Sequence, residues 1–100
     1  MAHLDEQAEP QGATRLYEAL CALESPEEAK ALLEDLCSRR ELSDLAQRLE
    51  VAHLLQTGAS YLDVSRETGA SSTTVSRVSK CLNGPTGGYR MVLSRLDGCQ

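Results

Sequence analysis

Short hydroxyl side chains and two cations cluster between residues 71 and 80, at a spacing that predicts one face of a helix. The residues are Ser71, Ser72, Thr73, Ser76, Arg77 and Lys80. Serine and threonine hydroxyls hydrogen-bond base edges or phosphates, and arginine and lysine hold phosphate or guanine. A serine N-cap at residue 71 also leaves backbone N–H groups that favour a phosphate. This composition indicates a DNA-binding face; the alternative is a capped helix start that only water contacts.

Two short helices are predicted to position this face. The run Ser60-Tyr61-Leu62-Asp63 has a capping pattern that begins the first helix, Gly69 interrupts it, and Ser71 caps a second helix that extends to about residue 82. The glycine supplies the backbone freedom for the bend. Two helices joined by such a turn form a helix-turn-helix, whose second helix enters the major groove of DNA. We therefore expect a helix-turn-helix at about residues 60–82.

Aliphatic residues on these two helices are spaced to hold them together. Val64 on the first helix is expected to face Val75 and Val78 on the second, with Leu82 one turn further on. Contacts between these side chains would lock the two helices through one apolar seam. The hydroxyl and basic side chains would then lie on the opposite face of the second helix.

Apolar residues at helical spacing predict further helices before and after this motif. One begins near residue 15 and ends at Ser25, which also starts the next helix through the capping box Ser25-Pro26-Glu27-Glu28. A long helix over about residues 41–57 is ended by Gly58. That helix is apolar on two sides, and we expect it to be sandwiched between neighbours.

The C-terminal part completes the expected architecture. Residues 83–88 form a loop rich in glycine, and a final helix is expected over residues 89–96. No strand pattern occurs, so the sequence predicts an all-α fold of about six helices. We expect a flexible leader at residues 1–14 and one helical domain at residues 15–97.

The composition limits how much apolar surface one copy buries. The chain has 100 residues, no Trp, no Phe and three Tyr, so its core must consist of leucine, valine and alanine. These residues bury less area than aromatic ones, and a chain this short buries only a modest fraction of its surface. A second copy would supply the missing burial. We therefore expect a homodimer.

The net charge of −5 argues against a polyanionic partner until its distribution is considered. Residues 1–58 hold twelve Asp and Glu against five Lys and Arg, whereas residues 59–100 hold three against five. The part that contains the expected helix-turn-helix is therefore weakly basic. An acidic part and a basic part in one chain are compatible with solubility and with affinity for phosphates.

Other classes of function lack support in the sequence. His3 and His53 have no nucleophile or metal-ligand partner at useful spacing, and the four cysteines form no CxxC pair. Two of them, Cys37 and Cys81, fall on apolar faces, where a free thiol behaves as a small hydrophobe. No apolar run approaches the roughly 20 residues that span a bilayer, and no export signal is present. We expect a cytoplasmic protein with no catalytic site, metal or cofactor.

Two segments resemble a known family. The run Thr68-Gly69-Ala70-Ser71-Ser72-Thr73-Thr74-Val75-Ser76-Arg77-Val78 and the later Gly87-Gly88-Tyr89-Arg90 are similar to the Trp repressor superfamily, and within it to the YerC/YecD-type proteins. The resemblance extends over about residues 16–96. It implies a DNA-binding repressor and an intertwined homodimer. It also implies that Tyr61 and Leu62 lie near the DNA backbone.

The same resemblance implies a ligand pocket between the long central helix and the recognition helix. Arg48 and Arg77 match the two arginines that clasp the corepressor, and Thr74 matches a pocket threonine. Val78 stands where the repressor has glycine against the indole, and Cys81 where it has a serine. We therefore expect tryptophan not to be the corepressor; the small-molecule effector is unknown.

Arg48 has an alternative role that needs no ligand. Asp44 lies one helical turn before it, and the two side chains could form an ion pair on the helix surface.

Two functions remain as hypotheses. The first is a sequence-specific transcriptional regulator, a repressor, whose homodimer places two recognition helices in successive major grooves. The alternative is a dimeric helical module that binds a protein partner and no DNA, which the overall acidity permits. The dependence of binding on salt separates the two, because DNA affinity falls steeply as salt rises.

Overall fold

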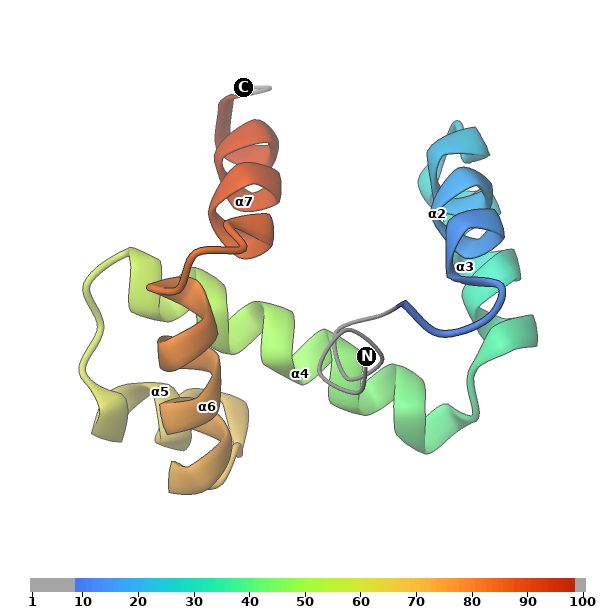
Figure 1. Cartoon of the computed structure of the whole chain (residues 1–100). Helices are drawn as coiled ribbons and strands as arrows, with labels where there is room; N and C mark the ends of the chain where they lie inside the picture. Colours follow the sequence, from blue (N-terminus) through green and yellow to red (C-terminus); the bar gives the residue numbers. More distant parts are fainter. Residues whose placement is uncertain (1–8, 99–100) are drawn as a thin grey trace, which may run out of the picture. The chain divides into compact units, whose positions relative to one another are not determined.

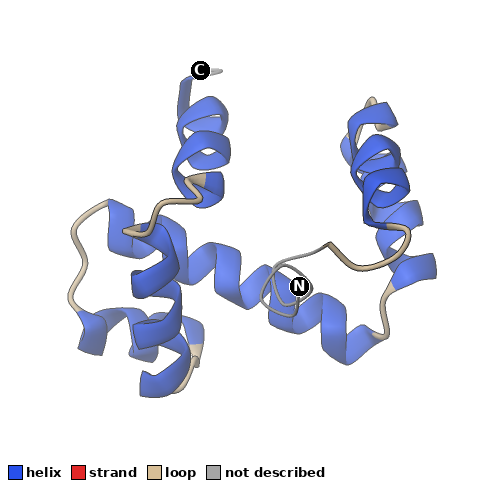
Figure 2. Cartoon of the chain, viewed as in Figure 1, coloured by secondary structure: helices blue, strands red, loops and turns tan. Residues whose placement is uncertain are grey.

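The computed structural model describes residues 9–98. Its helices, labelled in Figure 1, are α2 (Ala13–Ala22), α3 (Pro26–Leu36), α4 (Arg39–Gln56), α5 (Tyr61–Thr68), α6 (Ser72–Leu82) and α7 (Gly88–Gly98). No strand occurs in the described range, as Figure 2 shows. The all-α fold with about six helices is confirmed. The chain divides into two compact units, one up to Ser38 that holds α2 and α3, and one from Arg39 that holds α4 to α7.

The first helix of the N-terminal unit begins at a tight turn. The N–H of Ala13 donates to the carbonyl of Pro10 at 3.0 Å, and Gly12 has φ +85°, a conformation that glycine adopts at little cost. This turn starts the helix at Ala13 without a side-chain cap. Ala13 and Thr14 are therefore helical, which corrects the expected leader at residues 1–14. Residues 1–8 of that segment lie outside the described range.

The second helix of this unit begins at the predicted capping box. Ser25 Oγ accepts from the N–H of Glu28 at 3.1 Å, and Pro26 occupies the first helical position. The Glu28 carboxylate reaches back to the N–H of Glu24 at 2.9 Å, one residue earlier than in the usual box. Contacts between residues close together in the sequence therefore end the connection between α2 and α3 and start α3.

Apolar side chains of the N-terminal unit stay largely exposed within its own fold. Among its described residues only Ala13 is buried, and Leu36 on α3 is 53% exposed. The exposed polar contacts of this unit add little to its stability. The Tyr17 hydroxyl donates to Glu9 at 3.1 Å, and this hydrogen bond and the carboxylate charge raise the pKa of Tyr17 above its ordinary value. The unit therefore leaves leucine side chains available for another apolar surface.

The core of the C-terminal unit joins all four of its helices. It consists of Val51 and Ala52 on α4, Val64 on α5, Ala70 in the turn, Val75 and Val78 on α6, and Leu93 on α7. The largest fully buried side chains are Val51, Val64 and Val75, each from a different helix. The predicted packing of Val64 against the second helix of the motif is confirmed.

The long helix α4 contributes to this core only through its C-terminal half. Val51 and Ala52 are buried, whereas Leu45 and Leu49 on the earlier turns remain exposed, Leu49 by 39%. The helix begins at Arg39, two residues before the expected start, because arginines are good helix formers and continue it. One apolar side of α4 is thus covered by α5, α6 and α7, and the other is not covered within this unit.

Gly58 ends α4 as predicted. Its φ is +99°, and its N–H donates to the carbonyl of Leu55 at 3.1 Å. The N–H of Ala59 donates to the carbonyl of Leu54 at 3.1 Å, which completes a Schellman motif. This cap turns the chain so that α5 can pack on α4.

Truncation of Val64 tests the core. Val64→Ala removes two buried methyl groups and leaves a cavity, so the free energy of unfolding should fall by about 2 kcal/mol. The matched control is Leu62→Ala on the same helix, where a side chain 60% exposed is truncated and the change should be small. Urea denaturation measures both. Equal losses in the two variants would show that this cluster does not hold the unit together.

Candidate nucleic-acid interface

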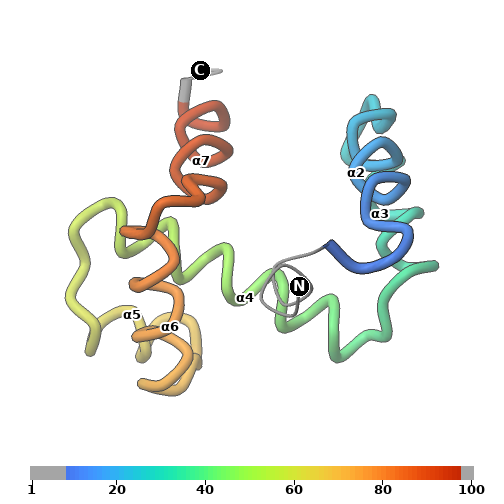
Figure 3. Tube along the Cα trace, viewed as in Figure 1, coloured from blue at the N-terminus to red at the C-terminus, as the bar shows by residue number. Residues whose placement is uncertain are grey.

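Helices α5 and α6 and the turn between them form the predicted helix-turn-helix, whose path Figure 3 traces. Both helices begin at the predicted serine caps. Ser60 Oγ accepts from the N–H of Asp63 at 3.1 Å, and Ser71 Oγ accepts from the N–H of Thr74 at 3.1 Å. Gly69 ends α5 with φ +76°, where a side chain would be strained.

Side chains around the turn fix it against α4. Ser65 Oγ donates to the carbonyl of Ala70 at 2.6 Å, and Thr68 Oγ1 accepts from the N–H of the same residue at 3.2 Å. Gln47 on α4 donates through Nε2 to the carbonyl of Thr68 at 3.1 Å. The turn is therefore tied both to its own helix and to the long helix behind it. No local sequence pattern predicts the Gln47 contact, because it joins residues far apart in the chain.

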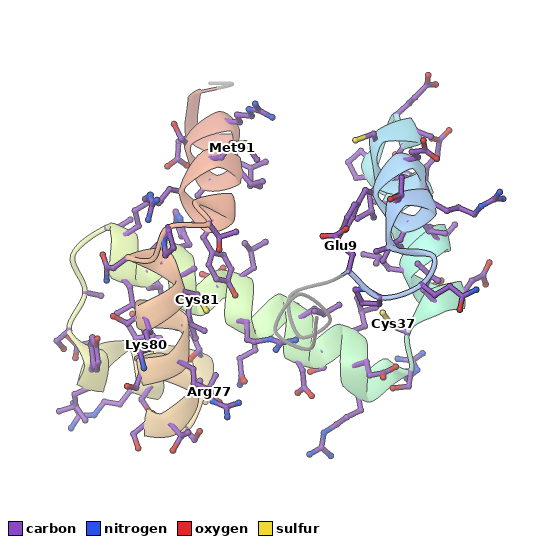
Figure 4. The ribbon with its side chains drawn as sticks, in the orientation of Figure 1. Glu9, Cys37, Arg77, Lys80, Cys81 and Met91 are labelled. Atoms are coloured by element: carbon purple, nitrogen blue, oxygen red, sulfur yellow. The ribbon has the colours of Figure 1, made fainter. Side chains whose placement is uncertain are left out.

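The second helix, α6, has two chemically distinct faces. Val75, Val78 and Leu82 are buried on its inner face, at most 7% exposed. The outer face carries exposed hydroxyl and basic side chains, namely Ser72, Thr73, Ser76, Arg77 and Lys80. Figure 4 labels the two cations on this helix. The residues proposed to contact DNA are thus brought together on one accessible surface.

Ser71 is exposed, but its hydroxyl is already engaged. Besides accepting from the N–H of Thr74, it donates to Thr74 Oγ1 at 3.1 Å. Its contribution to the start of α6 is therefore a cap. The N–H groups of Ser72 and Thr73 have no acceptor within the helix and point toward its N-terminal end, where a phosphate is favoured.

The N-terminus of α5 contacts α6 through Tyr61. The Tyr61 hydroxyl donates to Ser79 Oγ, which joins the first residue of α5 to the third turn of α6. Tyr61 and Leu62 are both exposed, as residues near a DNA backbone must be. The hydrogen bond adds a polar contact to the valine seam between the two helices.

The five residues expected to line a ligand pocket meet in one place. An open pocket of about 410 Å³ is lined by Arg48 from α4, by Thr74, Arg77, Val78, Lys80 and Cys81 from α6, and by Tyr89 from α7. Lys80 and Tyr89 were not foreseen from the sequence. Three cations therefore border a cavity that is apolar in part, a combination suited to a small anion.

The surroundings of three pocket residues bear on what the sequence predicted for them. Val78 is 3% exposed and belongs to the core cluster, so its side chain forms part of the packed wall of the pocket. Cys81 is exposed and borders an apolar hollow with Leu49 and Val92, so its expected placement on an apolar face is not contradicted. Within the described residues Arg48 makes no ion pair with Asp44, so the alternative role of Arg48 is not supported. Both Asp44 and Arg48 border a second, smaller hollow with Thr74.

The described residues do not form a metal site or a membrane span. No group of three or more His, Cys, Asp or Glu side chains is placed to hold a metal within the described residues. His53 is half-buried on α4, and His3 lies outside the described range. None of the described helices is both long and apolar enough to cross a membrane.

Comparison with known proteins agrees with this arrangement. The sequence profile of the Trp repressor protein family matches residues 11–97. YerC of Bacillus subtilis, an uncharacterized protein, is 43% identical over 82 residues, which cover 82% of this chain and 79% of YerC.

Solved structures give the same result. A TrpR-like protein from Eubacterium eligens has a TM-score of 0.84 and 38% identity, over 92% of this chain and 95% of that one. A candidate Trp repressor from Staphylococcus aureus has a TM-score of 0.85 and 35% identity, over 92% of each chain. The profile match covers residues 11–97, and YerC is 43% identical over 79% of its length, so the chain belongs to the Trp repressor family.

Proposed function

We propose that this protein is a sequence-specific DNA-binding regulator that acts in the cytoplasm as a homodimer and represses transcription by occupying its site. One observation carries the proposal: α6 buries a valine face against the core and exposes a hydroxyl and basic face to solvent. A recognition helix needs this division, since one side must be held rigidly and the other must enter a groove.

The exposed face has the side chains that such a role requires. Ser72, Thr73 and Ser76 are short, so the helix backbone can approach base edges closely. Arg77 and Lys80 lie one and two turns after Thr73 and are placed to neutralise phosphates or read guanine. Base contacts would supply sequence preference, and phosphate contacts most of the affinity.

The dimer is proposed from apolar surface that neither unit covers by itself. In the C-terminal unit Leu45, Leu49, Met91 and Val92 are exposed, and Leu96 is 56% exposed. In the N-terminal unit Leu16 and Leu20 are exposed on α2. Exposed aliphatic residues on several elements of a small chain mark an interface. A second copy fits best, because two-fold symmetry places two recognition helices about 34 Å apart, one turn of DNA.

We propose further that tryptophan is not the corepressor. By the family resemblance, the repressor has glycine against the indole, whereas here the Val78 isopropyl group forms that part of the pocket wall. Moving that group away would open the core to which it belongs. The three cations that border the pocket, Arg48, Arg77 and Lys80, favour a small anion as effector. No cofactor is part of the proposal.

Binding to DNA is tested with a double variant and a charge-matched control. Arg77→Ala with Lys80→Ala removes two cations from the exposed face of α6 and should abolish binding to duplex DNA. The control, Arg15→Ala with Lys30→Ala, removes the same charge from exposed positions on α2 and α3 and should bind within about twofold of the unchanged protein.

Fluorescence anisotropy against a random genomic duplex pool, at low and moderate salt, measures both variants. Sequencing of the bound fraction should yield a palindromic motif. Loss of affinity in both double variants alike would mean that only net charge matters. Absence of binding by the unchanged protein at low salt would favour the protein-interaction module.

Association is tested by placing a charge on the exposed apolar part of α7. Leu96→Asp should convert a dimer into a monomer, because the new carboxylate would be buried without a partner in the interface. Ser94→Asp on the same helix introduces the same charge at an exposed polar position and should leave the dimer intact. Sedimentation equilibrium reports the mass. A monomeric unchanged protein, or equal dissociation of both variants, contradicts the proposed interface.

The exclusion of tryptophan is tested by ligand-induced stabilisation. A ligand that binds only the folded state raises Tm, and the rise grows with the logarithm of ligand concentration above Kd. L-Tryptophan at millimolar concentration should shift the Tm no more than L-leucine does. A rise with tryptophan alone would show that the pocket accommodates an indole despite Val78.

A further inference from the structure

The segment Gly87-Gly88-Tyr89-Arg90, which carries part of the family resemblance, lies outside the proposed DNA-binding face. In the structure its last residue reaches back to the end of the recognition helix. Arg90 Nη1 donates to the carbonyl of Leu82, the last residue of α6, and to the carbonyl of Gly84 at 3.0 Å. A side chain of α7 thus contacts the backbone of α6 and of the loop after it.

This contact adds to the cap at the end of α6. A helix leaves its last four carbonyls without partners in the helix. The carbonyl of Ser79 accepts from the N–H and side-chain amide of Asn83 at 3.0 and 2.9 Å, and that of Cys81 accepts from the N–H of Gly84 at 3.1 Å. The carbonyl of Leu82 is satisfied by Arg90. The cap therefore depends on a residue that lies on the next helix.

The position of Arg90 on α7 is otherwise unfavourable. It lies in the first turn, where the positive end of the helix dipole repels a cation. At the C-terminal end of α6 the dipole has the opposite sign and attracts it. The guanidinium is therefore better placed toward α6 than toward its own helix. The unfavourable position of a cation in the first turn of α7 is offset by its contact with the end of α6.

The preceding glycine leaves room for this contact. Gly87 has φ +75°, and a Cβ added to it would lie 3.3 Å from Arg90 Nη2. Its neighbour Gly88 has no such restriction, since a Cβ there would meet nothing within 4 Å. The backbone conformation thus favours glycine at residue 87, and a side chain there would also press on the guanidinium.

We infer that Arg90 is a positioning residue that fixes the end of the recognition helix against α7. The inference rests on the proposed DNA-binding function, because it assigns Arg90 to the orientation of α6 and not to contact with phosphate. Helix α7 also carries Met91, Val92 and Leu96, the exposed apolar residues of the proposed dimer face. Arg90 therefore holds each recognition helix in a fixed relation to the partner subunit.

Amide hydrogen exchange tests the contact without DNA. Arg90→Met keeps most of the side-chain length and removes the donors, so the amides of Asn83 and Gly84 should exchange roughly tenfold faster or more. The amide of Gly69, bonded to the carbonyl of Ser65 at 2.9 Å in the other turn, should not change. Faster exchange at all three would mean general destabilisation and would overturn the local role.

A glycine pair provides a second test that keeps Arg90. Gly87→Ala places a methyl group against the guanidinium and strains the backbone, so it should reproduce the faster exchange at Asn83 and Gly84. Gly88→Ala makes the same change one residue later and should leave that exchange unaltered. Identical behaviour of the two alanine variants would contradict the inference.

The salt dependence of DNA binding separates positioning from phosphate contact. Arg90→Met should weaken binding while the slope of log affinity against log salt stays as in the unchanged protein. Lys80→Met, which removes a proposed phosphate contact, should reduce the slope by about one for each protomer bound. An Arg90→Met slope reduced like that of Lys80→Met, with Asn83 and Gly84 still protected, would make Arg90 a phosphate contact. If the unchanged protein binds no DNA, the proposed function fails, and the exchange data still decide whether Arg90 holds α6.

Discussion

The contact among three fully buried valines, one each from α4, α5 and α6, determines how the rest of the C-terminal unit is arranged. Val51, Val64 and Val75 are small and branched, so the three helix backbones can pack closely around one point. No tryptophan or phenylalanine is present to fill a wider gap. With its valine side held on α4, helix α6 presents its hydroxyl and basic residues, together with Cys81, to solvent. The surface chemistry of the motif is thus a consequence of its core.

Polar contacts add direction to this apolar packing. Two serine caps set where α5 and α6 begin, Gln47 ties the turn to α4, and Arg90 ties the end of α6 to α7. Valine packing alone would tolerate small rotations, whereas hydrogen bonds at both ends of a helix do not. The recognition helix is therefore constrained at its start, along its inner face and at its end, which is what a surface that must match a DNA groove requires.

The sequence predicted the features that depend on neighbouring residues and missed those that join distant ones. The caps at Ser60 and Ser71 and the glycine end at Gly58 follow from patterns of four or five residues, and the structure confirms them. The grouping of the pocket residues followed from a family resemblance. The contacts of Gln47 and Arg90 cross between elements and leave no local pattern.

An amide NMR titration with a short duplex at low salt would show whether the outer face of α6 binds DNA while its inner face stays packed. Shift changes should concentrate at the exposed outer residues of α6 and at its first amides. Val51 and Val64 in the core should change little. Changes confined to α2 and α3, or no changes at any duplex concentration, would contradict DNA binding by this face.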